Sequence, residues 1–200
     1  MKVVAGFLGY ECEDMVIYLA RIFSFLGRKT MVLDRTEEKS VLGILGEAKE
    51  NTDVCFSCFP DEGMMQDYDV ILKVFGYQPQ RKELEECRRL FLVTDGSAFR
   101  ARLLSKFKLW QEECCMIIRN MVSMQYKETY LMLLSEQKIE RCFTVFADER
   151  DVKGRCCLGI GKRISLHCLS ESMIEQLREL VQYLDASVDV KQLRTALKKA

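Results

Sequence analysis

The residues with the clearest chemical potential form the stretch G-F-L-G-Y-E-C-E-D-M, Gly6 to Met15, between an apolar run and a helical pattern. A glycine-bearing turn between a strand and a helix holds phosphate in many α/β proteins, because backbone N–H groups and the helix N-terminus attract anions. This stretch contains no lysine and no threonine, and it carries Glu11, Glu13 and Asp14. Such acids favour the helix dipole and repel a triphosphate. The stretch therefore predicts a loop that is closed to ATP.

Ten cysteines and one histidine are the other residues that could bind a metal or act as nucleophiles. Cys55-x-x-Cys58 is the only CxxC, but it lies in a strand pattern, where positions three apart point to opposite faces. A zinc site would need a second pair, and the other close cysteines are adjacent doublets. His167 and Cys168 are neighbours on an apparent strand, so their side chains would not converge. These patterns favour reduced, buried structural thiols, a structural or surface histidine and no metal, with a thiol redox or metal protein as an alternative.

The composition limits the class of protein. Two hundred residues suit one α/β domain covering 1–200, and 48% hydrophobic with 30% charged residues is ordinary for a globular protein. Lys+Arg and Asp+Glu number 30 each, so a formal net charge of zero argues against a general nucleic-acid binder. The first apolar run is too short for a secretion signal, and no other run would span a bilayer. We expect a cytoplasmic protein.

The elements around the opening stretch form a recognisable unit. Lys2–Phe7 is predicted as a strand, Met15–Leu26 as a largely buried helix capped by Asp14, and Thr30–Asp34 as a second strand. Gly27 is the expected stop of the helix. Strand, glycine turn, helix, glycine and strand make a βαβ unit, which implies parallel pairing.

The rest of the chain continues the alternation of strands and helices. Strands are predicted at 53–59, 68–75, 90–95, 142–147 and 163–168, and helices at 41–49, 82–89, 97–111, 112–120, 171–184 and 190–199. Such alternation predicts an α/β fold with a doubly wound, mostly parallel sheet flanked by helices in three layers.

Two parts of the chain resemble the MinD/ParA-type P-loop ATPases of the SIMIBI class. Lys2–Asp34 is similar to the family's opening: an apolar strand, a glycine-bearing loop, a helix ending in Leu-Gly-basic-basic, and a strand closing on aspartate. Asp67–Gly76, D-Y-D-V-I-L-K-V-F-G, resembles a later strand of the family, and Leu92–Asp95 resembles its "LVT" strand. The resemblance covers about half of the chain by element pattern and fades after roughly Trp110. It implies a P-loop NTPase-like fold.

The catalytic positions of that family are not retained. Its loop has two lysines around a Gly-Gly-x-Gly core, then Ser/Thr for magnesium, and a later strand ends in an aspartate that helps to hold the metal. The resemblance aligns Phe7 and Cys12 with the lysines, Leu8-Gly9-Tyr10-Glu11 with the core, Glu13 with the hydroxyl and Val74 with the strand-end aspartate. Of the family's D-x-D pair, Asp34 remains and Thr36 replaces the second aspartate, while Gly76 also remains.

Four further features have competing interpretations. Lys73 either forms a salt bridge to the acidic loop or extends to solvent from a strand end. Gly159–Lys162 is a tight turn rather than a phosphate loop, since a strand is expected after it. The basic stretch Phe99–Lys108 is interpreted as a solvated helix face. The amphipathic, basic helix at 190–199 is expected to dock on the domain rather than lie on a membrane.

Together these features predict a non-catalytic MinD/ParA-like pseudo-ATPase, without a cofactor, that serves as a scaffold or localisation partner of a membrane-associated or polar machine. The resemblance suggests pilus assembly, secretion, division or flagellar placement. A protein partner is expected, a homodimer would use a nucleotide-independent surface, and membrane association would be peripheral at most, through recruitment to the inner face by a partner. The alternatives are an active but divergent ATPase, the thiol or metal protein, and a receiver-like signalling domain with Asp34 or Asp95 as phosphate acceptor.

Overall fold

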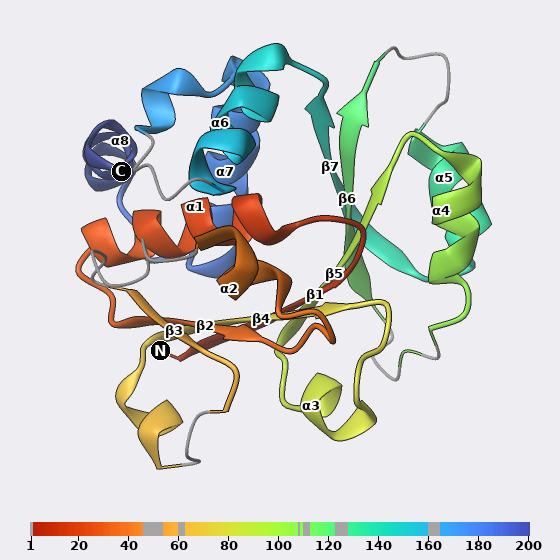
Figure 1. The fold of residues 1–200 in the computed structure, drawn as a ribbon, viewed down its shortest axis with the longest axis horizontal. Coiled ribbons are helices and arrows are strands. Elements are labelled where there is room, and N and C mark those ends of the chain that lie inside the picture. Colours follow the sequence, from red (N-terminus) through yellow and green to blue (C-terminus); the bar gives the residue numbers. More distant parts are fainter. Residues whose placement is uncertain are drawn as a thin grey trace.

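Parallel strands form one sheet through the middle of the protein (Figure 1). The computed structural model describes residues 2–45, 54–59, 63–107, 109, 113–122, 128–159 and 165–200. Within them the sheet has seven strands in the order β3-β2-β4-β1-β5-β6-β7, and every neighbouring pair is parallel. The strands are β1 (Val3–Gly9), β2 (Thr30–Asp34), β3 (Val54–Ser57), β4 (Val70–Gly76), β5 (Arg89–Asp95), β6 (Cys114–Met121) and β7 (Ile139–Phe146).

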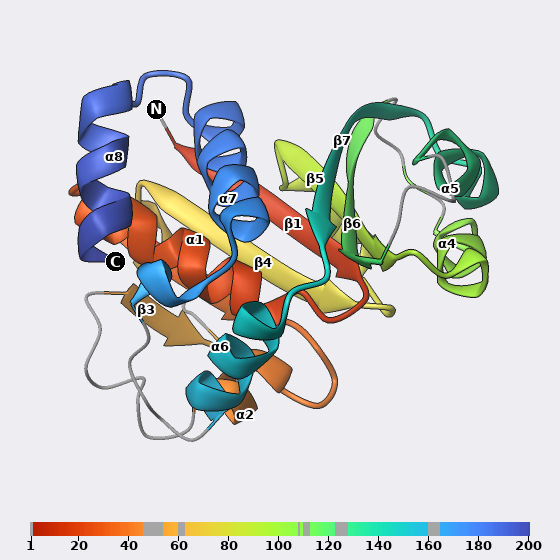
Figure 2. The same cartoon turned by 90° about the horizontal axis from the view of Figure 1, so that it is seen from above.

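Helices cover both faces of this sheet, which confirms the predicted three-layer α/β fold (Figures 1 and 2). One face packs against α1 (Glu13–Phe25), α2 (Ser40–Leu45), α6 (Glu149–Gly159), α7 (Glu171–Leu184) and α8 (Val190–Lys199). The other packs against α3 (Arg81–Glu85), α4 (Ala98–Leu104) and α5 (Glu128–Ser135). Short 3₁₀ turns lie at η2 (Met64–Asp67) and η3 (Leu166–Cys168).

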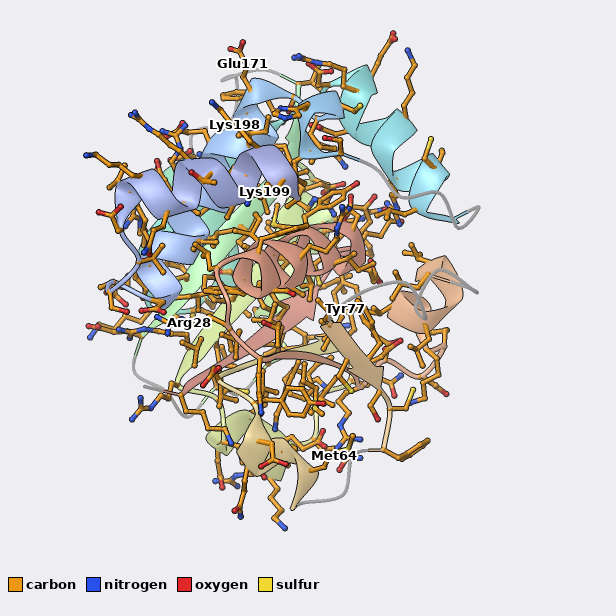
Figure 3. All side chains as sticks on the ribbon, turned by 90° about the vertical axis from the view of Figure 1, so that its left-hand side faces the viewer. Arg28, Met64, Tyr77, Glu171, Lys198 and Lys199 are labelled. Atoms are coloured by element: carbon orange, nitrogen blue, oxygen red, sulfur yellow. The ribbon has the colours of Figure 1, made fainter. Side chains whose placement is uncertain are left out.

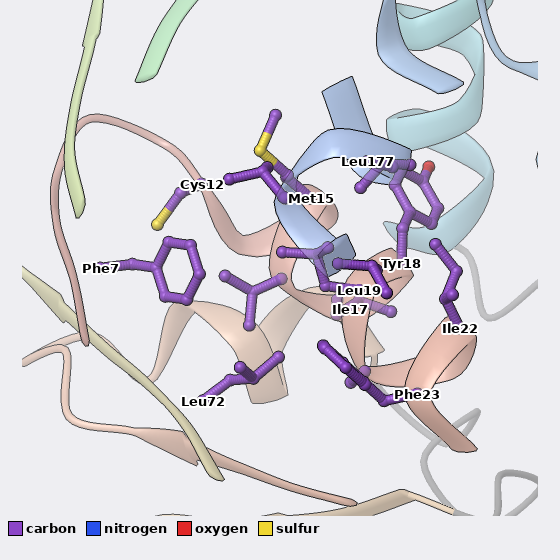
Figure 4. Close-up of a cluster of buried hydrophobic side chains, with 14 of the residues drawn as sticks. Phe7, Cys12, Met15, Ile17, Tyr18, Leu19, Ile22, Phe23, Leu72 and Leu177 are labelled. Carbon is purple, nitrogen blue, oxygen red and sulfur yellow. The ribbon is translucent and has the colours of Figure 1, made fainter. Parts of the chain in front are cut away.

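Strand alternation divides the core between the two faces. Ala5 and Phe7 of β1 belong to the cluster under α1, whereas Leu8 belongs to the cluster under α4. This follows from the period of two in a strand, which sends successive side chains to opposite faces. The rings of Phe7 and Phe91 stack at 4.9 Å between centroids on the α1 side. Figure 4 shows Phe7 among the side chains of α1.

Helix α1 is buried on nearly all sides, as its apolar sequence predicts. The sheet lies on one side of it and α7 and α8 lie on the other (Figure 2). The predicted stop at Gly27 is confirmed, because this residue has φ +78° and its N–H donates to the Ser24 carbonyl at 2.9 Å. The predicted cap is wrong: Cys12 is the N-cap residue, and Asp14 lies inside the helix.

Helix α8 docks on the domain, which confirms that expectation. Leu193 and Leu197 of α8 are part of the core cluster that contains α1. The charged side chains of the helix face outward, and Figure 3 shows this surface with Lys198 and Lys199. None of the helices in the described ranges combines the length and the hydropathy that a membrane span requires.

Several predicted elements in the second half are wrong. Residues 112–120 were predicted as a helix, but Cys114–Met121 is strand β6 with β5 and β7 on either side. An apolar run buried on both faces has no period of two, so it resembles a buried helix in sequence. Helices α5 and α6 had no counterpart among the predictions. Leu166–Cys168 form a turn of 3₁₀ helix, with Ser165 as its N-cap, rather than a strand, and 163–164 lie outside the described residues.

Boundary differences elsewhere are smaller. β1 runs on to Gly9, α4 ends at Leu104, and Arg89 begins β5 rather than ending a helix. Helix α2 covers Ser40–Leu45, and 46–49 of the predicted helix lie outside the described residues. Gly159 is the last residue of α6, which precedes the predicted turn, and 160–162 of that turn lie outside the described residues.

Candidate functional site

The residues of the opening stretch lie at the topological switch point of the sheet, where the order of the strands reverses. β1 sits between β4 and β5, so the chain builds one side of the sheet before it crosses to the other side. In open α/β sheets ligands bind outside the carboxyl ends of the strands at this switch point. The loop after β1 consists of Tyr10, Glu11 and Cys12, since α1 begins at Glu13. The candidate site is therefore this loop and the loops after β2 and β4.

Both glycines of the stretch lie in close contact with their surroundings, Gly6 with neighbouring side chains and Gly9 with a backbone oxygen. Gly6 is inside β1, and a Cβ there would lie 2.8 Å from the Leu90 side chain. Gly9 has φ +108°, and a Cβ there would lie 2.2 Å from the Val93 carbonyl oxygen. The next N–H, that of Tyr10, donates to the same carbonyl at 2.9 Å. These contacts tie the start of the loop to β5.

The positions aligned with the family's lysines are buried and uncharged. Phe7 is 0% exposed and points into the core, away from the loop. Cys12 is 1% exposed. Burial, with the nearby negative charges of Glu13 and Asp14, raises the pKa of the Cys12 thiol well above its ordinary value. A neutral thiol cannot supply the positive charge of a lysine.

Asp14 forms an ion pair with an arginine from β6, a strand in the other half of the sheet. Arg119 of β6 donates to both carboxylate oxygens of Asp14, at 2.7 and 2.8 Å, and also to the Glu11 carbonyl oxygen. Both side chains of the ion pair are buried. Burial alone would lower the pKa of Arg119, but the charge and hydrogen bonds of Asp14 outweigh it, so the pKa is raised. The acid at the helix N-terminus is thus neutralised within the protein.

Two more arginines contact the same short loop. Arg155 of α6 forms an ion pair with the Glu11 side chain. Arg100 of α4 lies over the Tyr10 ring, 3.4 Å from its centroid, and pairs with Asp95 at 3.0 Å. The solvated-face interpretation therefore fails for Arg100, although Arg102 and Lys106 are exposed as expected and Lys108 lies outside the described residues.

Sequence reasoning missed all three of these loop contacts. The partners lie far apart in the chain: 105 residues separate Asp14 from Arg119, and 144 separate Glu11 from Arg155. One signal was present, because Arg119 interrupts an otherwise apolar run, and a charge in such a run calls for a buried partner. Because this run was predicted as a helix, Arg119 was not expected near the loop. Only as a strand parallel to β5 does the run bring Arg119 to the loop.

The retained family residues have structural tasks. Asp34, at the end of β2, accepts from the Thr36 hydroxyl at 2.6 Å and from the N–H groups of Val41 and Leu42 at 2.9 and 3.1 Å. It thereby orders the turn before α2 and the start of that helix. Gly76 adopts φ +59° at the end of β4, and Val74 is buried.

Both interpretations of Lys73 are wrong: it neither pairs with the acidic loop nor extends to solvent. It is 2% exposed, and its Nζ lies 2.5 Å from the Glu86 carboxylate. Its neighbours Leu72 and Val74 face α1, so alternation points Lys73 to the opposite side of the sheet. The acidic loop continues into α1 on the other face, out of reach of Lys73.

The cysteines are less uniformly buried than expected. All ten are free thiols, but only four are buried: Cys12, Cys87, Cys114 and Cys115. Cys55 and Cys58 are half-buried, and Cys156 and Cys168 are exposed. The residues described include no cluster of three or more His, Cys, Asp or Glu side chains arranged to hold a metal ion. His167 is exposed, which agrees with the surface alternative of the two, and its Nε2 lies 3.1 Å from the Lys198 carbonyl oxygen.

A pocket of about 240 Å³ opens beside the loop, at the carboxyl ends of β1, β2 and β4. Glu11 and Glu13 contribute from the first loop and α1, Glu37 and Glu38 from the segment after β2, and Tyr77 from the segment after β4. The side chain of Glu13 is almost wholly buried, and its Oε2 has no hydrogen-bond partner among the described residues. The surroundings of the expected nucleotide position are therefore acidic.

The strand order excludes the receiver-like alternative. In the flavodoxin-like order of receiver domains the first strand lies beside the second and third. Here β1 lies beside β4 and β5. Asp34 and Asp95, the proposed acceptors, are engaged instead with the α2 N-terminus and with Arg100.

Comparison with known proteins locates this arrangement among solved folds. Neither a scan of protein-family models nor a search of curated proteins gives a match. Two Aquifex aeolicus structures are similar: MinD in complex with MinC (TM-score 0.57, 12% identity) and MinD alone (TM-score 0.56, 11% identity). Each alignment covers 89% of this chain and 96% of the other.

A ParA family ATPase from Chlorobium tepidum TLS aligns over 99% of this chain and 97% of its own, with 12% identity and a TM-score of 0.49. The similarity to the MinD structures extends far beyond the half of the chain in which the sequence resembles the family. The parallel sheet, its helical layers and the two MinD structures agree, and the chain has the fold of the MinD/ParA-type P-loop ATPases.

Proposed function

We propose that this protein is a non-catalytic, MinD/ParA-like pseudo-ATPase that acts as a scaffold or localisation partner of a membrane-associated or polar machine. The main observation that supports the proposal is the Asp14–Arg119 ion pair, which places a buried carboxylate in the first turn of α1. A P-loop needs positive potential and bare N–H groups at this point. Here the Asp14 side chain accepts from the Met15 N–H at 2.8 Å, and its charge is matched by Arg119.

The other charges near the loop support the same proposal. Each arginine that contacts the loop has an acidic partner: Asp14 for Arg119, Glu11 for Arg155 and Asp95 for Arg100. An incoming triphosphate would have to displace these carboxylates and would also face Glu13, Glu37 and Glu38 in the pocket. Repulsion between like charges at a few ångströms amounts to several kcal/mol at the intermediate dielectric of such a site.

Isothermal titration with MgATP tests the proposal, with MgCl₂ alone as the control and phosphate release measured in parallel. We expect no binding up to about 1 mM nucleotide, which corresponds to less than about 4 kcal/mol of binding free energy. Micromolar affinity, or phosphate release above that of buffer, would establish the active but divergent ATPase instead.

The proposed partners are proteins, with pilus assembly, secretion or division as the candidate machines. A related fold is known in a MinC:MinD complex, which supports a protein partner for this fold. We propose that the protein is cytoplasmic. Because α8 is packed against α1 rather than free to bind lipid, recruitment to the inner face of the membrane would depend on a partner. Crosslinking in the native cell followed by mass spectrometry tests this. Recovery of the chain without any component of such a machine would contradict it.

A further inference from the structure

A groove of about 500 Å³ lies between the end of α1 and the helix α8. Phe25 and Leu26 line it from the end of α1, and Lys191, Thr195 and Lys199 line it from α8. The three α8 residues are spaced by four, so they follow one side of the helix over its length. The groove therefore has one apolar wall and one wall with a cation at each end.

Phe25 is exposed at the end of a helix that is otherwise buried. It is 38% exposed, whereas every residue from Glu13 to Phe23 is buried. A single exposed apolar side chain is ordinary, but an apolar wall rimmed by charged groups is typical of an interaction site. The exposed ring is thus accessible to a ligand in the groove.

The surface beside the groove is strongly basic. Helix α8 carries four cations and no acid between Val190 and Lys199. All four cations are exposed: Lys191, Arg194, Lys198 and Lys199. Arg28 follows α1 directly and lies on the same face of the molecule as α8, but it is paired with Asp185 at 2.8 Å (Figure 3). The whole chain has a formal net charge of zero, so α8 concentrates positive charge beside the groove.

We propose that the groove binds an acidic segment of a partner protein, with an apolar side chain against Phe25 and carboxylates against Lys191 and Lys199. The two lysines are eight residues apart, which is about 12 Å along a helix axis. Four residues of an extended chain span about 13 Å, and alternate side chains of such a chain point the same way. Two acids four residues apart therefore match the lysines and direct the side chain midway between them to the apolar wall. This inference rests on the proposed function, because it names the surface through which the scaffold meets its partner.

The shape of the site favours a protein segment over a lipid surface. A helix that lies on a membrane buries its apolar face in the bilayer. The apolar face of α8 is turned inward instead, since Leu193 and Leu197 belong to the core. A groove admits a narrow chain, whereas a flat bilayer meets only its rim. Complementary charge with an apolar anchor suits the recognition of a peptide.

Fluorescence anisotropy on the full chain tests the proposal with a fluorescein-labelled, capped nonapeptide, Gly-Ser-Glu-Ser-Phe-Ser-Glu-Ser-Gly. Two peptides with the same label are its controls: one has glutamine in place of both glutamates, and the other has alanine in place of phenylalanine. We expect the parent peptide to bind with a dissociation constant below about 1 mM and both control peptides to bind more weakly, the glutamine peptide by about 10-fold or more. The affinity of the parent peptide should fall as NaCl rises from about 50 to about 500 mM, because salt screens exposed charges.

Charge reversal on α8 locates the binding. Lys191→Glu combined with Lys199→Glu should weaken binding of the parent peptide by about 10-fold or more, because attraction becomes repulsion. The matched control combines Lys82→Glu with Lys106→Glu, which changes the net charge equally at exposed positions on the α3 and α4 side of the sheet and should leave the affinity within about 2-fold. Phe25→Ala should weaken binding by about 3-fold or more, because the apolar anchor loses its contact. Circular dichroism checks the fold of each variant.

Three results of the peptide experiment would overturn the inference: no binding of the parent peptide up to about 1 mM, equal binding of the glutamine peptide, or equal affinities in the α8 and control double variants. Sedimentation with vesicles of phosphatidylcholine and phosphatidylglycerol supplies a further arm. Vesicle binding that the α8 double variant abolishes, without peptide binding, would replace the protein partner by an anionic lipid surface.

The tests of this inference and of the proposed function fail separately. Peptide binding is measured without nucleotide, so its failure leaves the MgATP result unchanged. MgATP binding would overturn the pseudo-ATPase proposal and leave the peptide result standing.

Discussion

Asp14 and Arg119 show how one contact can decide both the stability of a site and its chemistry. Their side chains are 2% and 5% exposed, and two hydrogen bonds join them. Removal of one partner leaves the other charge buried without compensation. The loss of one partner should therefore destabilise the fold by more than the intact pair stabilises it, because a single charge stays buried.

We predict that Arg119→Met lowers the free energy of unfolding by about 3–5 kcal/mol, measured by urea denaturation. The control is Arg150→Met, which breaks an exposed pair with Asp148 and should have a much smaller effect, because solvent screens that pair. The double variant Asp14→Leu with Arg119→Met should recover much of the loss, because no charge stays unpaired. Equal losses in Arg119→Met and Arg150→Met would show that the buried pair has no special weight.

Gly9 is the second position where one residue controls the loop. We predict that Gly9→Ala destabilises the protein by more than about 3 kcal/mol, because strain at positive φ adds to a contact with a backbone oxygen at 2.2 Å. Gly43→Ala is the matched control: it lies in α2, nothing is within 4 Å of its Cβ, and it should stabilise by about 0.5–1 kcal/mol. Similar denaturation midpoints for the two variants would contradict the close approach to β5.

At the scale of elements, α6 is attached to the loop after β1 through Arg155 and Glu11. Burial tends to raise the pKa of Glu11, but hydrogen bonds from Arg155 and Tyr10 with the Arg155 charge lower it below its ordinary value of 4.5. Because the pKa of Glu11 is lower in the folded state, the ionised carboxylate stabilises the fold at pH values above its ordinary pKa. The contribution disappears as the pH falls through the lowered pKa.

Arg155→Met should therefore destabilise the protein by about 0.5–1 kcal/mol near neutral pH, a small cost because both side chains are more than a third exposed. The difference from the wild type should shrink as the pH falls below about 4.5, measured by urea denaturation along a pH series. Arg81→Met, which breaks an exposed pair with Glu85, is the control and should have a smaller effect. A wild-type difference that is constant or grows on acidification would contradict the Glu11 linkage.

Elements also show which parts of the fold a sequence can predict. The β1–α1–β2 unit was recovered because glycines bound it and its strands are short apolar runs. Strand β6 was missed because its run is apolar on both faces and has no strand period. The arginine contacts to the loop were missed with it, since they depend on tertiary placement of β6, α4 and α6. Local pattern predicts elements, whereas the site depends on which strands become neighbours.

At the scale of the whole molecule, the sheet order agrees with a MinD-like fold while the loop charges differ from those of a nucleotide site. Nucleotide binding and self-association are distinct properties, so each needs its own measurement. If MgATP bound with a dissociation constant one hundredth of its concentration, it would stabilise the fold by about 2.7 kcal/mol. For a chain of this size that would raise the melting temperature by roughly 5–10 °C.

We predict no such shift, and the same oligomeric state with and without nucleotide. Differential scanning calorimetry and light scattering after size exclusion measure the two properties, with magnesium tripolyphosphate at equal ionic strength as the control for non-specific anion effects. The reason is that Asp14, Glu11 and Glu13 occupy the helix N-terminus and the pocket that a triphosphate would need. A dimer that forms only with MgATP would contradict a nucleotide-independent surface. A dimer of equal mass in both conditions would support such a surface, because the acids of two facing loops would repel each other in a nucleotide-face dimer.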